Sequence, residues 1–327
     1  MRDPYFDFLK GIAIWLVVFG HCMQSFYPNW SENWVALAIY AFHMPLFMAI
    51  SGKFFLSSVS KVSCTTFIKK KFVRLYLPSL CWGLIHAIIL SGGKYMAHHE
   101  IDIPYSLNLV FTGMWFLTVL FIFNVIGSLI EKWASSKRYI AWLLLFLLLY
   151  FSPSFWMRNQ LLYLLPFFVG SFELGRYNWK CCPLWLGVIS LGLFVIVLFR
   201  YYSFDVSLYR MTADVLSEKY HFHSLIRYTL GFTGCISSIF ICKYLFILPG
   251  LTKIIIGIGK NTLPIYVLHQ FILLPNLYIK YSTINHFLIF IFSVLLVFIS
   301  IIIYLILQKQ RYLKLYLFGE KSELVFV

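Results

Sequence analysis

Long apolar runs, separated by short polar segments, recur along the whole chain. A helix needs about 20 apolar residues to cross a hydrocarbon core of about 30 Å, and ten stretches of the sequence approach that length. The fifth and sixth are the weakest, because Ser152-Pro153 interrupts the apolar run, so a re-entrant pair is the alternative for these two. The pattern predicts an all-α, polytopic membrane helix bundle of about ten transmembrane helices, at residues 11–28, 34–56, 72–92, 112–130, 139–155, 160–176, 183–200, 225–248, 262–279 and 286–308.

The amino-acid composition is typical of an integral membrane protein. Hydrophobic residues make up 61% of the 327 residues and charged residues 12%, against about 45–50% and roughly 25% in soluble proteins. This balance excludes a soluble enzyme and a disordered regulator. Repeats, polar linkers and long loops are absent from the sequence, which predicts a single transmembrane domain over residues 1–327.

The formal charge of +15 is distributed unevenly between the predicted loops. In a soluble protein such a surplus would indicate nucleic acid. With the N-terminus in the cytoplasm, 20 of the 27 lysines and arginines fall on the cytoplasmic side, and seven on the outer side. The positive-inside rule then predicts that both termini are cytoplasmic, and no nucleic-acid partner is expected. The seven outer residues are Lys94, Arg158, Arg200, Arg210, Lys219, Arg227 and Lys280.

The first span carries three ionisable residues, Asp7, Lys10 and His21. Lys10 and His21 are eleven residues apart, which in an α-helix is about 20° beyond three turns and about 16 Å along the axis. They therefore share one helix face, with Asp7 one turn below Lys10. Ionisable groups within a span are candidates for function. The alternatives are an interfacial anchor for Lys10, a helix–helix hydrogen bond for His21 and a helix-capping role for Asp7.

Other polar residues of the spans are weaker candidates. His43 and His269 lie within predicted spans and could face a cavity for the acceptor, although helix packing explains them as well. Lys71 and Arg74 are three residues apart, a spacing that suits a phosphate clamp but equally marks the cytoplasmic side. Trp115 begins the fourth span, where an aromatic belt also explains it. The seven cysteines show no paired spacing, so we expect neither a metal site nor a disulfide.

Five segments, in this order along the chain, resemble acyltransferase family 3, the membrane O-acyltransferases that modify cell-envelope glycans. Each segment alone is a weak signal, but their order across a ten-span chain is a strong one. The segments are DFLKGIAIWLVVFGH (7–21), FHMPLFMAISGKFF (42–55), KKKFVRLYLP (69–78), MWFLTVLF (114–121) and IGKNTLPIYVLHQ (258–270).

The resemblance implies an O-acetyltransferase of the bacterial cytoplasmic (inner) membrane. Its co-substrate would be acetyl-CoA or another acyl-CoA arriving from the cytoplasm, with no bound cofactor, and its acceptor a hydroxyl of a polysaccharide such as O-antigen or of a lipid-linked sugar precursor. His21 falls at the family's essential histidine and Lys10 at its Arg/Lys position. The third-span pair departs from the family's Arg-x-x-Arg pattern, because Lys71 keeps the charge but loses bidentate geometry. Since the chain stops soon after the last span, we expect no fused SGNH hydrolase-like domain, and a separate periplasmic protein would supply any second transfer step.

These residues lead to a mechanistic hypothesis and to one rival. Lys10, Lys71 and Arg74 would hold the phosphates of acyl-CoA, and the pantetheine arm would reach His21. His21 would act as the base that deprotonates the acceptor hydroxyl, or as the acceptor of the acyl group itself. The rival is a transporter or flippase of lipid-linked glycans, which explains the spans, the buried histidines and the outer arginines but not the ordered motifs.

Overall fold

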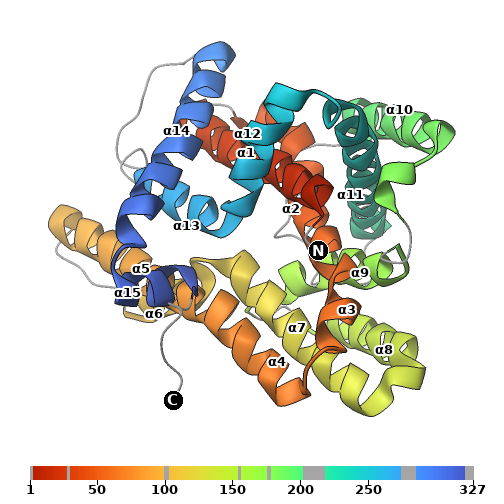
Figure 1. The fold of residues 1–327 in the computed structure, drawn as a ribbon, viewed down its shortest axis with the longest axis horizontal. Helices are drawn as coiled ribbons and strands as arrows, with labels where there is room; N and C mark the ends of the chain where they lie inside the picture. The colour runs from red at the N-terminus through yellow and green to blue at the C-terminus, as the bar shows by residue number, and fades with distance from the viewer. Residues whose placement is uncertain are drawn as a thin grey trace. The chain divides into compact units, whose positions relative to one another are not determined.

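The computed structural model describes residues 3–27, 30–98, 103–153, 156–174, 178–201, 218–273 and 285–320 (Figure 1). Within these ranges every regular element is a helix, which confirms the predicted all-α class. The last residues of four predicted spans, 28, 154–155, 175–176 and 274–279, lie outside the described residues.

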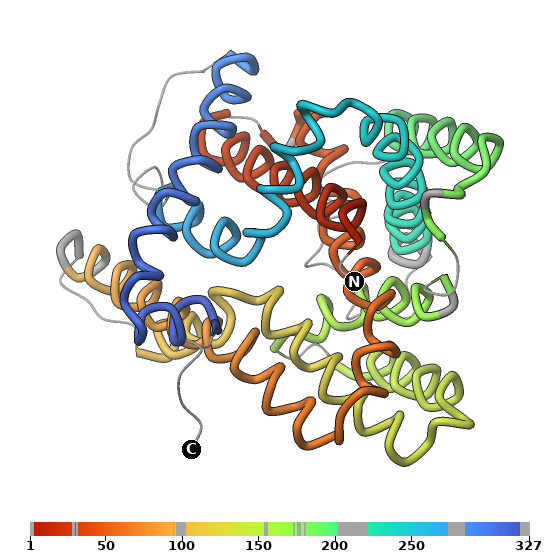
Figure 2. The backbone as a smooth tube through the Cα atoms, viewed as in Figure 1, coloured from red at the N-terminus to blue at the C-terminus, as the bar shows by residue number. Residues whose placement is uncertain are grey.

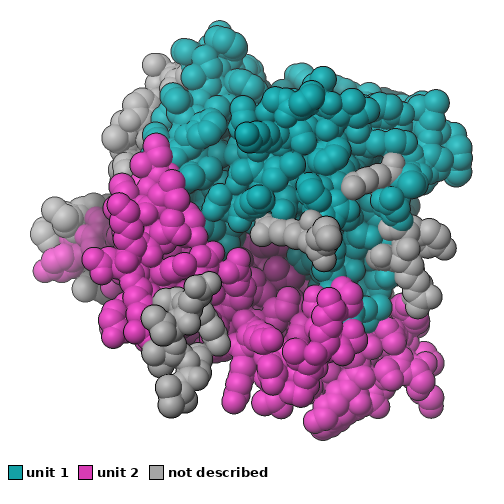
Figure 3. All heavy atoms as spheres, viewed as in Figure 1, with its two compact units in different colours: residues 1–56, 145–301 teal, residues 57–144, 302–327 magenta. Residues whose placement is uncertain are grey.

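The chain divides into two compact units, coloured separately in Figure 3. Unit 1 consists of residues 1–56 and 145–301, and unit 2 of residues 57–144 and 302–327. Helices of unit 1 are α1 (Pro4–Phe26), η1 (Trp30–Glu32), α2 (Trp34–Lys53), α9 (Arg158–Leu174), η4 (Trp179–Cys181), α10 (Leu184–Tyr201), α11 (Glu218–Leu245), α12 (Pro249–Lys260) and α13 (Thr262–Leu273). Those of unit 2 are α4 (Cys64–Lys71), η2 (Phe72–Tyr76), α5 (Leu77–His98), α6 (Ile103–Thr112), α7 (Trp115–Ala134), η3 (Ser135–Lys137) and α15 (Arg311–Phe318). Three helices contribute residues to both units, α3 (Phe55–Val59), α8 (Arg138–Phe151) and α14 (His286–Leu307).

Seven of the described helical segments are long and apolar enough to cross a membrane, or eight when α12 and α13 are counted as one broken span. The membrane-helix character predicted from the sequence is thereby confirmed. The predicted count of ten differs at two places. The fourth and fifth predicted spans lie in one helical run, Trp115–Phe151, because η3 joins α7 to α8 without a loop. The sixth corresponds to α9, which has only 17 residues.

Helix α1 begins at a well-defined cap and continues without a break. The Asp3 carboxylate accepts a hydrogen bond from the Tyr5 backbone N–H, and Pro4 occupies the first turn, where its missing N–H costs nothing. The helix then runs to Phe26 with most of its surface buried. The face shared by Lys10 and His21 is therefore carried by one uninterrupted helix.

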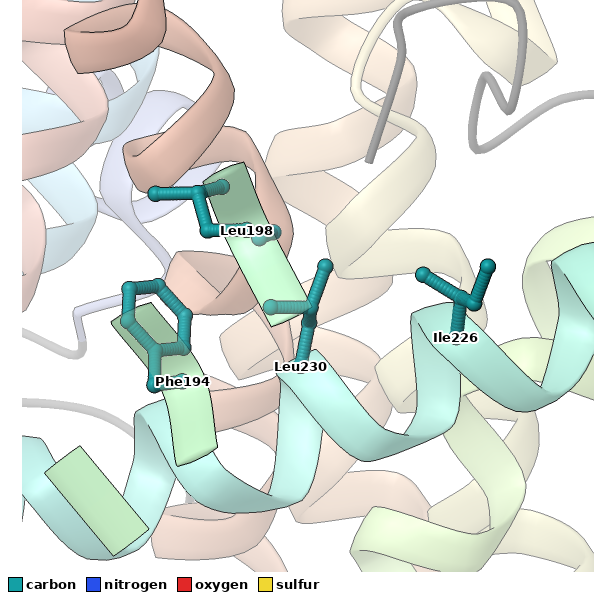
Figure 4. Close-up of a cluster of buried hydrophobic side chains, with 5 residues drawn as sticks. Phe194, Leu198, Ile226 and Leu230 are labelled. Carbon is teal, nitrogen blue, oxygen red and sulfur yellow. The ribbon is translucent and has the colours of Figure 1, made fainter. Parts of the chain in front are cut away.

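Helices α2, α10 and α11 form a second packed region of unit 1. Phe194 and Leu198 of α10 meet Ile226 and Leu230 of α11 in a buried cluster (Figure 4) that also includes Ala41 of α2. All five side chains are at most 8% exposed. This packing fixes α2, and so holds the segment that carries His43.

Helix α12 and the bend that follows it were not predicted from the sequence. Figure 2 shows the backbone turning sharply between α12 and α13, where the two helix axes differ in direction by 78°. The approach of α12 to α1 depends on two glycines, because a Cβ on Gly11 would overlap the Ile255 carbonyl oxygen and one on Gly259 would overlap the Asp7 carbonyl oxygen. Small residues allow such close approach between membrane helices. The bend then directs α13 along the later turns of α1.

In unit 2, helix α6 occupies a segment that the sequence analysis treated as an outer loop, residues 93–111. It packs along α5, and a Cβ on Gly83 would overlap the backbone of Val110. Helix α7 continues beside α4 and η2, where Tyr76 stacks on Phe121 with ring centroids 4.9 Å apart. The predicted loop is therefore largely helical, and α6 lies close to α5 although none of its residues is buried.

Candidate active site

The structure brings two of the predicted candidate histidines into direct contact. His21 lies on α1 and His269 on α13, and His269 Nε2 is 3.0 Å from His21 Nδ1. Their ring centroids are 5.0 Å apart. This contact joins residues 248 positions apart in the sequence, and it exists because α13 runs beside α1 after the bend.

The histidines of unit 1 differ in how far they are buried. His269 is 0% exposed and His43, on α2, is 2% exposed, whereas His21 is partly exposed. The Nδ1 atoms of His43 and His269 each lie within hydrogen-bond distance of a carbonyl one turn earlier in their own helix, at 2.6 Å from Ile39 and 2.7 Å from Ile265. Of these three histidines, His21 is therefore the least deeply buried residue.

Tyr40 of α2 connects His21 with His43. Its ring centroid lies 6.3 Å from that of His21, nearly parallel to it, and 5.1 Å from that of His43. The Tyr40 hydroxyl donates a hydrogen bond to Gln24 Oε1 at 3.1 Å. Sequence analysis missed both residues, although each lies three positions from a candidate histidine and so on a neighbouring position of the same helix surface.

At the other end of α1, Lys10 lies beside Asp7, while Asp3, and not Asp7, caps the helix. Lys10 Nζ is 4.0 Å from Asp7 Oδ1, and the Asp7 side chain is 3% exposed while that of Lys10 is 29% exposed. Lys10 Nζ also lies 5.6 Å from the centroid of the Phe54 ring. Asp7 stands in the first turn of α1, where a carboxylate interacts favourably with the helix dipole. Lys10 thus keeps a partly accessible ammonium on the helix that carries His21.

The remaining candidates, Lys71, Arg74 and Trp115, belong to unit 2. Lys71 ends α4 and its Nζ lies 5.1 Å from the centroid of the Phe67 ring, whereas Arg74 stands in the π-helical turn η2 and its Nη1 lies 3.5 Å from Glu320 Oε1. The wider π-helical turn alters the α-helical i,i+3 relation from which a shared face was predicted. Trp115 begins α7 and its ring meets that of the next residue in the chain, with centroids 5.9 Å apart.

Glu320 is a residue of unit 2 that sequence analysis did not single out. Its Oε2 accepts a hydrogen bond from the Tyr304 hydroxyl at 2.8 Å and lies 4.0 Å from Lys314 Nζ, while Oε1 faces Arg74. Gly319, at φ 62°, adopts the left-handed conformation that ends α15 and brings Glu320 to this position. No periodicity within one helix connects residue 74 with residue 320, so the pattern of the sequence carried no signal for this contact.

An apolar pocket of about 300 Å³ lies in unit 1 between α1, α12 and α14. Its walls include Ile12 and Trp15 of α1 and Phe290 of α14, and its lining contains none of the candidate histidines. A pocket without polar groups offers nothing that moves a proton or stabilises a charge. It is therefore separate from the candidate chemistry around His21.

Comparison with known proteins gives two partial relatives. The chain is 45% identical over 85 residues to the nodulation protein NolL of Sinorhizobium fredii, a match that covers 25% of this chain and 23% of that protein. It is 35% identical over 126 residues to the nodulation protein NolL of Mesorhizobium japonicum, covering 37% of this chain and 34% of that protein. The matched stretches thus span about a quarter of one relative and about a third of the other. No solved structure matches the chain.

The family comparison covers far more of the molecule. The profile of acyltransferase family 3, described as an acyltransferase domain, matches residues 3–306. This range includes α1 with Lys10 and His21, and the α12–α13 segment with His269. Together with the apolar helices, the match identifies the chain as a membrane-embedded acyltransferase of acyltransferase family 3.

Proposed function

We propose that this protein is an O-acetyltransferase of the bacterial inner membrane that transfers an acetyl or similar acyl group from acyl-CoA to a hydroxyl of a cell-surface polysaccharide or its lipid-linked sugar precursor. The observation that carries the proposal is the contact of His21, a partly exposed residue, with His269 at 3.0 Å within the family's domain. An imidazole changes its charge near neutral pH and is the side chain most often used for proton transfer.

His21 can perform the transfer in either of two ways. As a base, it takes the proton of the acceptor hydroxyl while the oxygen attacks the thioester carbonyl; the carbon–sulfur bond breaks, and the CoA thiolate recovers the proton from the imidazolium. As a nucleophile, an imidazole nitrogen attacks the thioester carbonyl, the carbon–sulfur bond breaks, and CoA leaves as its thiol with the proton of the other ring nitrogen. The acceptor hydroxyl then takes the acyl group from the acyl-histidine and returns its proton to the imidazole. A burst of CoA release equal to the enzyme concentration, with a trapped acyl-histidine, would select the second route.

Lys10 is the proposed ligand for the phosphates of acyl-CoA in unit 1. It lies eleven residues before His21 on an uninterrupted helix, a distance of about 16 Å along the axis. Such a separation suits a long, thin donor with its phosphates at one end and its thioester at the other. Lys71 and Arg74 are proposed as further phosphate ligands because of their positive charge, and the Arg74 side chain is 54% exposed.

The test is transfer of label from radioactive acetyl-CoA to glycan in isolated membranes. We expect His21→Ala to insert at the normal level and to lose transfer by at least about 100-fold, the lower end of the contribution of a proton-transferring side chain. The matched control is His223→Ala, which removes a partly exposed histidine of α11. Normal acetylation in the His21→Ala membranes would contradict the proposal.

The same membranes test the rival, a transporter or flippase of lipid-linked glycans. A flippase would leave acetyl label out of the glycan in the parent protein and would lose glycan translocation in the His21→Ala variant. One of the outer arginines that such a function would use, Arg227, is 3% exposed and lies 4.7 Å from the centroid of the Tyr163 ring. Its guanidinium is therefore packed inside unit 1 and is not exposed as the outer loop position of Arg227 predicts.

A further inference from the structure

We propose that His269 is a positioning residue that holds His21 in the tautomer with its proton on Nδ1 and its lone pair on Nε2, the nitrogen that then reacts. The inference rests on the proposed function of His21 and goes beyond it by assigning the reacting atom. It follows from three hydrogen-bonding steps that start at a backbone carbonyl.

The first step fixes the proton of His269. Its Nδ1 lies 2.7 Å from the carbonyl oxygen of Ile265. A carbonyl oxygen only accepts hydrogen bonds, and its second lone pair remains available when the first is used by the helix. His269 must therefore carry a proton on Nδ1 and donate it to Ile265.

The second step concerns the charge of His269. The side chain is 0% exposed, and among the described residues no carboxylate forms an ion pair with His269 or His21. A buried imidazolium without an acidic partner is strongly unfavourable. His269 is thus neutral, and because its proton sits on Nδ1, its Nε2 can only accept.

The third step transfers this constraint to His21. His269 Nε2 lies 3.0 Å from His21 Nδ1, so His21 Nδ1 must donate. A neutral imidazole has one N–H, and its lone pair is therefore on Nε2. The hydrogen bond made by one ring nitrogen sets which nitrogen is available for chemistry. His21 is also the partly exposed residue of the pair, so the basic nitrogen belongs to the less deeply buried histidine.

His43 provides an internal comparison. It is buried and has the same bond from Nδ1 to the carbonyl one turn earlier, Ile39, at 2.6 Å. Its Nδ1 donates to a carbonyl of its own helix, as in His269. No hydrogen bond joins His43 to His21 in the described contacts. A change at His43 should leave the tautomer of His21 as it is.

The test uses protein labelled with ¹⁵N-histidine in detergent or nanodiscs, with the His21 signals assigned by their loss in His21→Gln. We expect His21 to show a protonated Nδ1 and an unprotonated Nε2 in the parent protein. His269→Gln places an amide oxygen near the position of Nε2 and should preserve this form. The shorter side chain in His269→Asn reaches only the position of Nδ1, and that in His269→Leu has no acceptor. Both variants therefore lose the acceptor for the His21 Nδ1 proton and should shift His21 toward the form with its proton on Nε2. His43→Leu should lose its own signals and leave those of His21 as in the parent protein.

Activity provides the second measurement. In acetyl transfer, we expect His269→Asn to lower kcat at least about tenfold, the lower end of the effect known for partners that orient metal-binding histidines through the second nitrogen, with the KM for acetyl-CoA unchanged. His269→Gln should recover most of the loss. A role in packing alone would not distinguish two amides in this way.

The outcomes separate this inference from the proposed function. An unchanged His21 tautomer in both His269→Asn and His269→Leu, or an Nε2–H form in the parent, would overturn the inference whatever the activity. A changed tautomer with unchanged kcat would remove the positioning role. Normal transfer in His21→Gln itself would instead refute the proposed role of His21, while the NMR result would still report on the hydrogen bond.

Discussion

Helix α1 carries ionisable side chains at two places along its length, and each place has different partners. Near its start, Asp7 and Lys10 lie within 4.0 Å of one another, and near its end His21 contacts His269. Between them, residues such as Ala13, Val17 and Val18 are at most 1% exposed. Charge and imidazole chemistry are therefore kept apart along the helix, and a substitution at one position should affect one step of the reaction.

Replacing Lys10 with Gln should weaken donor binding and leave the chemical step largely intact. A charge-assisted hydrogen bond is worth about 1.5–3 kcal/mol, so we expect the KM for acetyl-CoA to rise by about tenfold or more, since about 1.4 kcal/mol corresponds to tenfold. Lys10→Arg should retain a KM near that of the parent. The measurement is the dependence of label transfer on acetyl-CoA concentration.

Lys53 offers a matched control for the loss of one positive charge in unit 1. It ends α2, and its Nζ lies 5.1 Å from the ring centroids of both Phe6 and Trp179. Lys53→Gln should leave the KM for acetyl-CoA close to that of the parent. If the two variants raised KM equally, general attraction between a basic protein and an anionic donor would explain the effect, and the specific role of Lys10 would be wrong.

At the scale of helices, those that coincide with a continuous apolar run can be predicted from the sequence. Helices that depend on a neighbouring helix cannot. Helices α1, α2, α10, α11 and α14 each follow from a long apolar run in the sequence. Helix α12 has only 12 residues, including a proline, three glycines and two lysines. Its helical state depends on the surface that α1 provides, and single-segment patterns contain no information on that contact.

The same distinction explains which parts of the candidate site were predictable. The relation between Lys10 and His21 lies within one helix, so helical periodicity is sufficient to place them on one face. The contact between His21 and His269 requires the bend at Asn261 and the glycine contacts of α12, which are tertiary features. The position of His269 within a predicted span brought it into the list of candidates, but its partner and its hydrogen bonds required the structure.

Replacing Gly259 with Ala should destabilise unit 1 by forcing α12 away from α1. The added Cβ would overlap the Asp7 carbonyl oxygen, and overpacking of this kind costs about 1–3 kcal/mol. We expect a lower midpoint of thermal unfolding in detergent and a weaker acetyl transfer, because α13 follows α12 directly. The midpoint is measured by the temperature dependence of aggregation or of tryptophan fluorescence.

Gly257 is the control within the same helix. A Cβ at this position meets nothing within 4 Å, and alanine is favoured over glycine in a helix by up to about 1 kcal/mol. Gly257→Ala should therefore unfold at the same temperature as the parent or at a higher one. Equal stability of the two alanine variants would show that close packing at Gly259 is not needed to hold α12 on α1.

At the scale of the whole chain, the charge bias predicts on which side of the membrane each connection lies. Seven of the 27 basic residues fall on the predicted outer side, yet two of them, Arg158 and Arg227, are buried at 0% and 3% exposure. Arg158 donates hydrogen bonds to the carbonyl oxygens of Leu149 and Tyr150, at 2.7 Å each. These two arginines thus serve packing, so the outer side exposes even fewer basic groups than the count indicates, which strengthens the predicted bias.

Two exposed positions on opposite predicted sides allow this orientation to be measured. Glu32 in η1 follows the first span and should face outward, whereas Ser136 in η3 should face the cytoplasm; both are exposed. Both cysteines are introduced into a protein in which Cys181 and Cys182 are replaced by Ser, and the labelling of that protein gives the blank. A membrane-impermeant maleimide added to spheroplasts should label Glu32→Cys and not Ser136→Cys. After the membrane is permeabilised, the maleimide should label both variants, which shows that Ser136→Cys is accessible once the reagent can reach it. Labelling of Ser136→Cys in sealed spheroplasts, with Glu32→Cys protected, would invert the orientation. It would place Lys10 at the outer end of α1, where cytoplasmic acyl-CoA does not arrive, and the proposed donor site would fail with it.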